Sequence, residues 1–256
     1  MIWNPSPTAF TLMNWPVRWY GLAYILGFWG AWHAANGWKM RFPRYGQDFV
    51  SDPVFNGLVF SSLIGGRLGY VFLYDPVYFW QYPWHILFLW EGGMAFHGAL
   101  VGIIIFVCTY AVRYRSPTVW GLMDVWAPAI PWGLFWGRIA NFVNQEVYGR
   151  VTDCAWGVIF GAVDVHPRHP SQIYEAMGEG IFLGAILLWA VYKTSWPRYP
   201  GRLTSFFLGG YGVIRFACEY FRVPDGVWMD MWTTGQMYSL PMIVIGFGKF
   251  ARTYRA

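Results

Sequence analysis

The residues best suited to chemistry lie in one otherwise apolar stretch, PWGLFWGRIANFVNQEVYGR, which covers residues 131–150. If this stretch is helical, Arg138, Asn141 and Gln145 share one face, because residues three or four apart stack on a helix. An arginine inside a membrane costs at least ~2.5–3.5 kcal/mol, so it usually faces a polar cavity or a partner. We therefore take this stretch as the first candidate for an active site.

A second arginine, Arg215, also lies within an apolar segment. Arginine presents a planar fork that fits phosphate, and it keeps its charge when it is buried. Two such arginines favour a site for an anionic group. The alternative is a structural ion pair for each of them, Arg138 with Glu146 and Arg215 with Glu219, the latter pair being four residues apart.

The composition is that of a membrane protein. Of the 256 residues 56% are hydrophobic and 12% are charged, with a mean hydropathy of +0.32; an average soluble domain has about 25% charged residues. The net charge of +5 is better explained by orientation in a membrane than by binding to nucleic acid, and no nucleic-acid partner is expected. Cys108, Cys154 and Cys218 show no paired spacing, so neither a disulfide framework nor a metal cluster is expected.

Seven apolar segments are long enough, at roughly 17–25 residues, to cross a bilayer as helices. They are approximately Trp19–Ala35, Pro53–Tyr74, Met94–Val112, Val119–Phe142, Ala176–Tyr192, Leu203–Phe221 and Gln236–Phe250. The expected fold is all-α, a polytopic integral membrane protein with a single seven-span domain over residues 1–256. A small segment at about 146–175 separates the fourth and fifth spans. Pro128 and Pro131 predict a kink in the fourth span, and Asp124 just before it is expected to be structural.

Lysines and arginines outside the spans divide unequally between the two sides of the membrane. Eleven fall on one side, including all three lysines, and four on the other. Because loops rich in Lys and Arg stay in the cytoplasm, the N-terminus is expected to be outside and the C-terminus cytoplasmic. This orientation puts the costly polar groups in the outer half of their spans: Tyr20, Arg67, His97, Arg138 and Arg215. It predicts a polar, partly positive cavity at the outer head groups, where a phosphate ester would belong to a phospholipid.

The histidines offer a base. His97 lies in EGGMAFHGALVG, and a neutral imidazole is the usual general base for a thiol or hydroxyl. A structural, hydrogen-bonded His97 is the alternative. His166 and His169 are three apart in HPRHPSQIYE, but the prolines there argue against the helix that a metal pair would need. Ser171 near His169 raises a serine-hydrolase or intramembrane-protease hypothesis, which the lack of a GxSxG motif disfavours.

Six stretches resemble motifs of the bacterial prolipoprotein diacylglyceryl transferase family, in the order of that family. They are RWYGLAY (18–24), GGRLGYVFLY (65–74), EGGMAFHGALVG (91–102), the stretch from Asp124 to Arg150, RHPSQIYE (168–175) and GGYGVIRFACEYFRVPD (209–225). The resemblance covers nearly the whole chain, and GRIANFVNQE is similar to the family signature. Ala140 and Ala99 stand where the family usually has glycine; both changes are small for small and remove no chemical group.

The resemblance implies an enzyme that transfers the diacylglyceryl group of phosphatidylglycerol to the lipobox cysteine of an exported prolipoprotein, releasing glycerol phosphate. It implies phosphatidylglycerol and prolipoprotein signal peptides as partners, and a site on the periplasmic side of the bacterial inner membrane. We expect a monomer and no metal or other cofactor.

The resemblance also assigns residues. It implies phospholipid-binding, essential roles for Arg138, Asn141, Glu146 and Gly149, and it places Tyr20, His97, Gly98, Tyr211, Arg215 and Glu219 at the site. We expect His97, Arg138 and Arg215 to be catalytic. The residues expected to bind substrate are Tyr20, Gly98, Asn141, Glu146, Gly149, His169, Tyr211 and Glu219. In the expected mechanism the two arginines hold the phosphate. His97 takes the proton of the acceptor thiol, because the thiolate is the nucleophile.

Two other functions fit the polar residues. A transporter or channel for an anionic solute would be favoured by an inverted repeat or a pair of broken helices, and the sequence shows neither. The buried arginines also leave the inner half of the spans without a polar route. Another phospholipid head-group transferase would differ only in the nucleophile, and the family resemblance alone argues against it.

Overall fold

The structure is a computed structural model that describes residues 2–13, 15–43, 48–89, 92–113, 119–224, 226–228 and 231–255. Glu91 and Asp225, which belong to two of the motifs above, lie outside these residues. Contacts divide the chain into two compact units. The first unit comprises Met1–Pro43 and Asp124–Ala256, and the second unit comprises Arg44–Met123.

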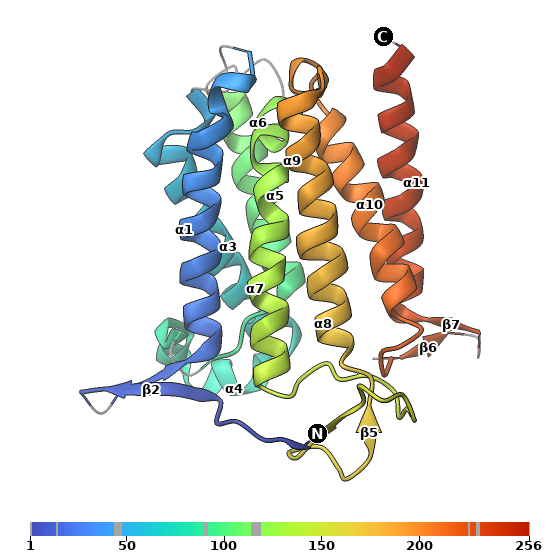
Figure 1. Cartoon of the computed structure of the whole chain (residues 1–256). Helices are drawn as coiled ribbons and strands as arrows, with labels where there is room; N and C mark the ends of the chain where they lie inside the picture. Colours follow the sequence, from blue (N-terminus) through green and yellow to red (C-terminus); the bar gives the residue numbers. More distant parts are fainter. Residues whose placement is uncertain are drawn as a thin grey trace. The chain divides into compact units, whose positions relative to one another are not determined.

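The protein is mostly helical, and each apolar segment predicted to span the membrane forms helix (Figure 1). In the described residues the α-helices are α1 (Trp19–Trp38), α3 (Asp52–Leu73), α4 (Pro76–Gln81), α5 (Phe96–Arg113), α6 (Val119–Trp126), α7 (Ile130–Val143), α8 (Ser171–Glu175), α9 (Leu183–Lys193), α10 (Arg202–Cys218) and α11 (Thr234–Arg255). Within the described residues, three helical stretches are long and apolar enough to cross a membrane: Asp52–Leu73, Phe96–Arg113 and Ser171–Lys193.

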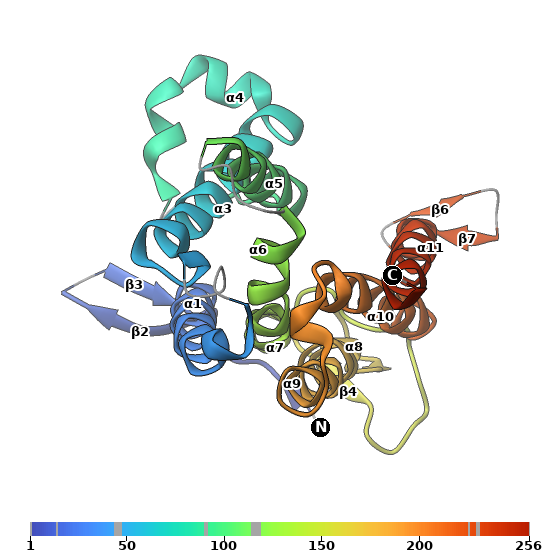
Figure 2. The same ribbon diagram turned by 90° about the horizontal axis from the view of Figure 1, so that it is seen from above.

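In the first unit the long helices pack in pairs. α1 packs on α7 and α10 packs on α11, as the end-on view of Figure 2 shows. α7 also packs on the π-helical segment η5 (Ala176–Phe182). The kink predicted for the fourth span is confirmed: α6 and α7 are separated by the 3₁₀ turn η4 (Ala127–Ala129). Pro128 lacks the N–H that a continuous α-helix would need there.

Asp124 ties α6 to the beginning of α10. Its carboxylate is fully buried and accepts hydrogen bonds from the N–H groups of Gly201 (2.7 Å) and Thr204 (2.8 Å) and from the Thr204 hydroxyl (2.6 Å). The first N–H groups of a helix have no partner within the helix, so Asp124 supplies the missing acceptor. This geometry agrees with the structural role that the sequence predicted.

Asp124→Ala should therefore destabilise the fold strongly. Two N–H groups and one hydroxyl would be left buried without an acceptor, at a cost of about 2 kcal/mol or more. Thermal unfolding of the purified protein in detergent would measure the effect. Asp153→Ala, at an exposed carboxylate, is the matched control and should change the melting temperature little. Equal melting temperatures for the two variants would contradict the capping role.

Short strands, which the sequence did not predict, occupy the segments outside the helices. β1 (Ile2–Trp3) runs parallel to β4 (Val158–Phe160), which pairs antiparallel with β5 (Pro167–Arg168). β2 (Thr8–Leu12) pairs with β3 (Trp15–Arg18), and β6 (Val227–Trp228) with β7 (Trp232–Thr233), both antiparallel. Residues 144–170 connect α7 to α8. The segment between these helices was expected at about 146–175, but α8 already begins at Ser171.

In the second unit, α3 and α5 approach each other at glycines. A Cβ atom added to Gly98 would lie 2.3 Å from the carbonyl oxygen of Gly65 and 2.7 Å from the Cα of Gly69. Small residues at such positions let two membrane helices pack backbone to backbone. Gly98, predicted to bind substrate, thus lies in a helix–helix contact.

Arg67, on α3, is buried and saturated by the backbone of its own unit. It donates hydrogen bonds to the carbonyl oxygens of Ile86 (3.0 Å) and Gly93 (3.1 Å), and its guanidinium lies 5.0 Å from the ring centre of Phe79. Phe79 belongs to α4 (Pro76–Gln81), and Ile86 to the 3₁₀ helix η2 (Pro83–Leu87). Arg67 therefore fixes the connection between α3 and α5, which contains α4 and η2.

Candidate functional site

A π-helical segment presents two carboxylates to the interior of the first unit. Glu175 ends α8 and Glu179 lies in η5, and both side chains are fully buried. π-Helical turns are rare and occur often at functional sites. Glycines beside Glu179 allow close packing: a Cβ at Gly180 would lie 2.6 Å from the Cβ of Phe135 on α7. Two buried carboxylates in an apolar helix require charged or hydrogen-bonding partners.

Arginines from two other helices supply those partners. Arg138 of α7 contacts Glu175 from Nη1 (3.0 Å) and donates from Nε to Glu179 (3.1 Å). Arg215 of α10 contacts both Glu175 (3.1 Å) and Glu219 (2.5 Å) from Nη1. Glu175 is therefore the carboxylate that joins α7 to α10.

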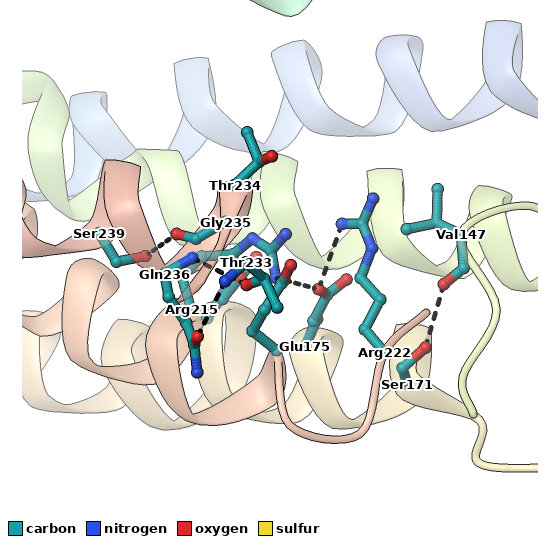
Figure 3. A network of polar contacts seen from close by, with 12 residues as sticks. Val147, Ser171, Glu175, Arg215, Arg222, Thr233, Thr234, Gly235, Gln236 and Ser239 are labelled. Carbon is teal, nitrogen blue, oxygen red and sulfur yellow. Dashed lines mark hydrogen bonds and ion pairs between the residues drawn. The ribbon is translucent and has the colours of Figure 1, made fainter. Parts of the chain in front are cut away.

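Arg222, which follows α10, is the third arginine, 3.7 Å from Glu175 (Figure 3). We call this set the arginine–glutamate cluster: Arg138, Glu175, Glu179, Arg215, Glu219 and Arg222. Its three guanidinium groups and three carboxylates balance in formal charge. All three carboxylates are fully buried, whereas the side chains of Arg138 and Arg215 remain 15% and 11% exposed. Solvent therefore reaches the arginine side chains of the cluster but not its carboxylates.

The structure corrects one of the two pairings considered from sequence. The Arg215–Glu219 pair is present, but Arg138 pairs with Glu175 and Glu179 rather than with Glu146. Sequence reasoning overlooked Glu179, although it lies inside a predicted span. The cost of a buried charge, which singled out the arginines, applies equally to a carboxylate and would have found it.

Arg215 keeps donors for a ligand. Both of its ion pairs with described residues run from Nη1, so the edge formed by Nε and Nη2 can bind an oxyanion in the side-on geometry that arginine favours. Tyr211, one turn earlier on α10, interacts electrostatically with Arg138 and Glu179. Binding of an oxyanion at that edge would leave both ion pairs of Arg215 intact.

Glu219, paired with Arg215, also lies against the beginning of a helix. A Cβ atom at Gly235, in the first turn of α11, would lie 2.5 Å from the Glu219 carboxylate carbon. Helix N-termini favour negative charge, because their first N–H groups are unpaired and the helix dipole is positive there. The small residue at 235 lets this carboxylate reach the beginning of α11.

A second polar group adjoins the cluster. The Tyr20 hydroxyl of α1 donates to Glu146 (2.6 Å), and the side-chain amide of Asn141 donates to the Tyr20 oxygen and to Glu146 (3.4 Å). Asn141 lies three residues after Arg138 on α7, so the two face the same side. Glu146 itself is exposed. Hydroxyl, amide and carboxylate together can bind a polyol.

Gly149 and His169 lie where the 144–170 connection meets the end of α10. The Gly149 N–H donates to the His169 carbonyl (3.0 Å), and Nδ1 of His169 shares a hydrogen bond with the Tyr174 hydroxyl (3.1 Å). Arg168 donates to the Gly149 carbonyl (3.1 Å) and binds Asp164. Its guanidinium holds the pKa of the Asp164 carboxyl below the usual range. Gly149 and His169 thus shape the connection next to Glu146.

The structure brings most of the predicted site residues together in the first unit. These are Tyr20, Arg138, Asn141, Glu146, Gly149, His169, Tyr211, Arg215 and Glu219. His97 and Gly98 belong to the second unit, where His97 is exposed in the first turn of α5. The Ser171 hydroxyl is fully buried and donates to a backbone carbonyl, an arrangement that disfavours a serine nucleophile. In the described part of the chain no group of three or more His, Cys, Asp or Glu is placed to hold a metal ion.

Fold and site define a mostly helical protein of apolar composition with a buried arginine–glutamate cluster next to a hydrogen-bonded group of Tyr20, Asn141 and Glu146. The family model described as prolipoprotein diacylglyceryl transferase matches residues 7–252. The chain belongs to this family, whose members are membrane enzymes.

Curated relatives span nearly the whole chain. A phosphatidylglycerol–prolipoprotein diacylglyceryl transferase of Legionella pneumophila (strain Philadelphia 1) is 42% identical over 95% of this chain and 95% of its own length. Enzymes of the same name from Pasteurella multocida and Ruegeria pomeroyi are 43% and 38% identical, over 94% of this chain and 89% and 92% of their own lengths. The motifs identified from sequence therefore indicated the correct family.

Proposed function

We propose that the protein transfers the diacylglyceryl group of phosphatidylglycerol to a cysteine thiol of a prolipoprotein, forming a thioether and releasing glycerol phosphate. The observation that carries this proposal is the arginine–glutamate cluster, whose Arg138 lies three residues before Asn141 on α7, and Asn141 is hydrogen-bonded to Tyr20 and Glu146. Relatives that span nearly the whole chain bear the name of this enzyme.

The cluster suits the bond that breaks. A carbon–sulfur bond forms at the glyceryl carbon while the carbon–oxygen bond to phosphate breaks, and its electron pair goes to the phosphate oxygen. Arg138 and Arg215 stabilise the charge that builds there, because fixed guanidinium donors in a dry site favour a developing oxyanion. Glu175 and Glu179 hold Arg138 in place and offset the cost of burying its charge.

The hydrogen-bonded residues Tyr20, Asn141 and Glu146 suit the glycerol of the lipid head group. Phosphatidylglycerol carries a second glycerol with two free hydroxyls, which can donate to the Glu146 carboxylate and accept from Asn141. Glu146 is exposed and already fixed by Tyr20 (2.6 Å), so it is ready to receive such donors. We assign Tyr20, Asn141 and Glu146 to this glycerol, with Gly149 and His169 shaping the connection behind it. Tyr211 and Glu219 orient Arg138 and Arg215.

We place the protein in the bacterial inner membrane as a monomer with one seven-span domain. The N-terminus is periplasmic, the C-terminus is cytoplasmic, and the site opens toward the periplasm. Support comes from the helices formed by all seven apolar segments and from the uneven division of Lys and Arg between their connections. Cysteine labelling at single introduced sites on either side would test this topology.

The same proposal makes His97 the base for the acceptor thiol. His97→Gln should lower kcat at neutral pH by about 10²- to 10⁴-fold, the usual contribution of a general base, and the loss should shrink as the pH approaches the thiol pKa. A pH–rate profile of transfer measures this. Turnover near the wild-type rate at pH 7 would remove the base assignment and leave the arginine assignment untouched.

The deciding experiment uses purified protein, phosphatidylglycerol and a peptide with a lipobox cysteine, with peptide mass followed over time. The expected result is a gain of one diacylglyceryl group, which is lost with a Cys→Ser peptide. Release of glycerol phosphate without peptide modification would indicate a hydrolase or another acceptor. No lipid turnover by well-folded protein would favour an anion transporter instead.

A further inference from the structure

The backbone on both sides of Glu146 is strained. Gln145 has φ of +60° and Val147 has φ of +58°. Residues other than glycine rarely adopt this left-handed conformation, and a β-branched residue such as Val147 is a true exception. Such conformations persist only where neighbouring groups hold them, and they concentrate at functional sites. The cause of the strain must therefore lie in the contacts of this turn.

Two buried side chains of α8 hold the turn from one side. The Gln172 amide donates to the Glu146 carbonyl (2.7 Å), and the Ser171 hydroxyl donates to the Val147 carbonyl (3.0 Å), as Figure 3 shows for the latter pair. Ser171 and Gln172 are both fully buried. The two acceptors are the backbone carbonyls of Glu146 and Val147. These hydrogen bonds therefore fix the orientation of the peptide groups that follow these two residues.

The turn is also held at its beginning. The side-chain oxygen of Gln145 accepts from the Ala162 N–H (2.8 Å), and the Glu146 N–H donates to the Asn141 carbonyl (2.9 Å). With its N–H and its carbonyl both fixed, the Cα–Cβ bond of Glu146 has a defined direction. From this position the carboxylate accepts the hydrogen bond of the Tyr20 hydroxyl (2.6 Å).

We propose that Gln172 and Ser171 are positioning residues that hold Glu146 in this strained turn, so that its carboxylate meets Tyr20 and Asn141 and receives the head-group glycerol. This inference rests on the proposed function, which assigns Glu146 to that glycerol. Gln172 and Ser171 are both fully buried, so they act through the backbone of the turn.

The test uses a glycine that adopts the turn without help. Gln172→Leu keeps the size of the side chain but removes the donor, and it should raise KM for phosphatidylglycerol about 10- to 100-fold with a smaller change in kcat. Adding Val147→Gly should restore most of the loss, because glycine reaches positive φ without steric cost. Ser171→Ala with and without Val147→Gly provides the same comparison if Gln172→Leu does not fold.

The control places a glycine where the backbone is relaxed. Val165 lies in the same 144–170 connection, is 79% exposed and has no positive φ. Val165→Gly should leave the KM of the Gln172→Leu protein unchanged. Wild-type KM in Gln172→Leu, or a raised KM that Val147→Gly fails to lower in a protein of wild-type melting temperature, would overturn the positioning role. Absence of transfer by the wild-type protein would instead remove the proposed function itself.

Discussion

Arg138→Gln should reduce diacylglyceryl transfer by about 10³-fold or more, since removing even one donor to a developing oxyanion costs 10²–10³. Arg138 also contacts Glu175 and Glu179, both fully buried. Removing one partner of a buried ion pair leaves an uncompensated charge and costs about 3–5 kcal/mol of stability. The loss of activity must therefore be separated from a loss of folded protein.

The double variant Arg138→Gln with Glu179→Gln makes this separation. It removes one positive and one negative charge, so the cluster stays balanced and most of the melting temperature should return. Transfer should stay absent, because the guanidinium is still missing. Arg198→Gln, at an exposed arginine outside the cluster, should behave as wild type in both measurements. Recovery of transfer in the double variant would show that Arg138 acts only by neutralising Glu179.

Apolar segments predicted the helices, and charged residues inside those segments predicted that Arg138 and Arg215 belong to a site. The cost of placing a charge in an apolar segment can be read from single residues, and so can an ion pair within one helix, such as Arg215 with Glu219. The Arg138–Glu175 contact joins helices that are separated by the 144–170 connection. No periodicity within either helix determines which of its residues will meet the other.

The strained turn at residues 145–147 is harder to predict from sequence than the ion pairs. Local preference argues against positive φ at Gln145 and Val147, so propensity would predict a different backbone there. The turn exists because Ser171 and Gln172, on the following helix, and Ala162, within the connection, all bind it. The position of Glu146 is thus a property of the assembled first unit rather than of its own segment.

Gly149→Ala should abolish diacylglyceryl transfer, because it displaces the turn that carries Glu146. A Cβ atom at position 149 would lie 2.2 Å from the His169 carbonyl oxygen and 2.7 Å from that of Phe221. Both are backbone atoms, so neither can rotate away as a side chain would, and the chain before Gly149 must shift. The shift would break the hydrogen bond from the Gly149 N–H to His169 (3.0 Å) and move Glu146 away from Tyr20. We expect a loss of transfer of more than about 100-fold, since small misplacements of binding groups cost that much.

Gly137→Ala is the matched control, because it adds the same methyl group in α7, next to Arg138, where no neighbouring atom lies within 4 Å. Alanine is the better helix former by about 1 kcal/mol, so this variant should be at least as stable as wild type and fully active. Overpacking at Gly149 should lower stability by only about 1–3 kcal/mol, and folded protein should remain for the assay. Full transfer by the folded Gly149→Ala protein would mean that the turn can move without cost, and Glu146 would then need no fixed backbone. A loss confined to Gly149→Ala, with raised KM for phosphatidylglycerol, would tie head-group binding to the close approach of these three backbone segments.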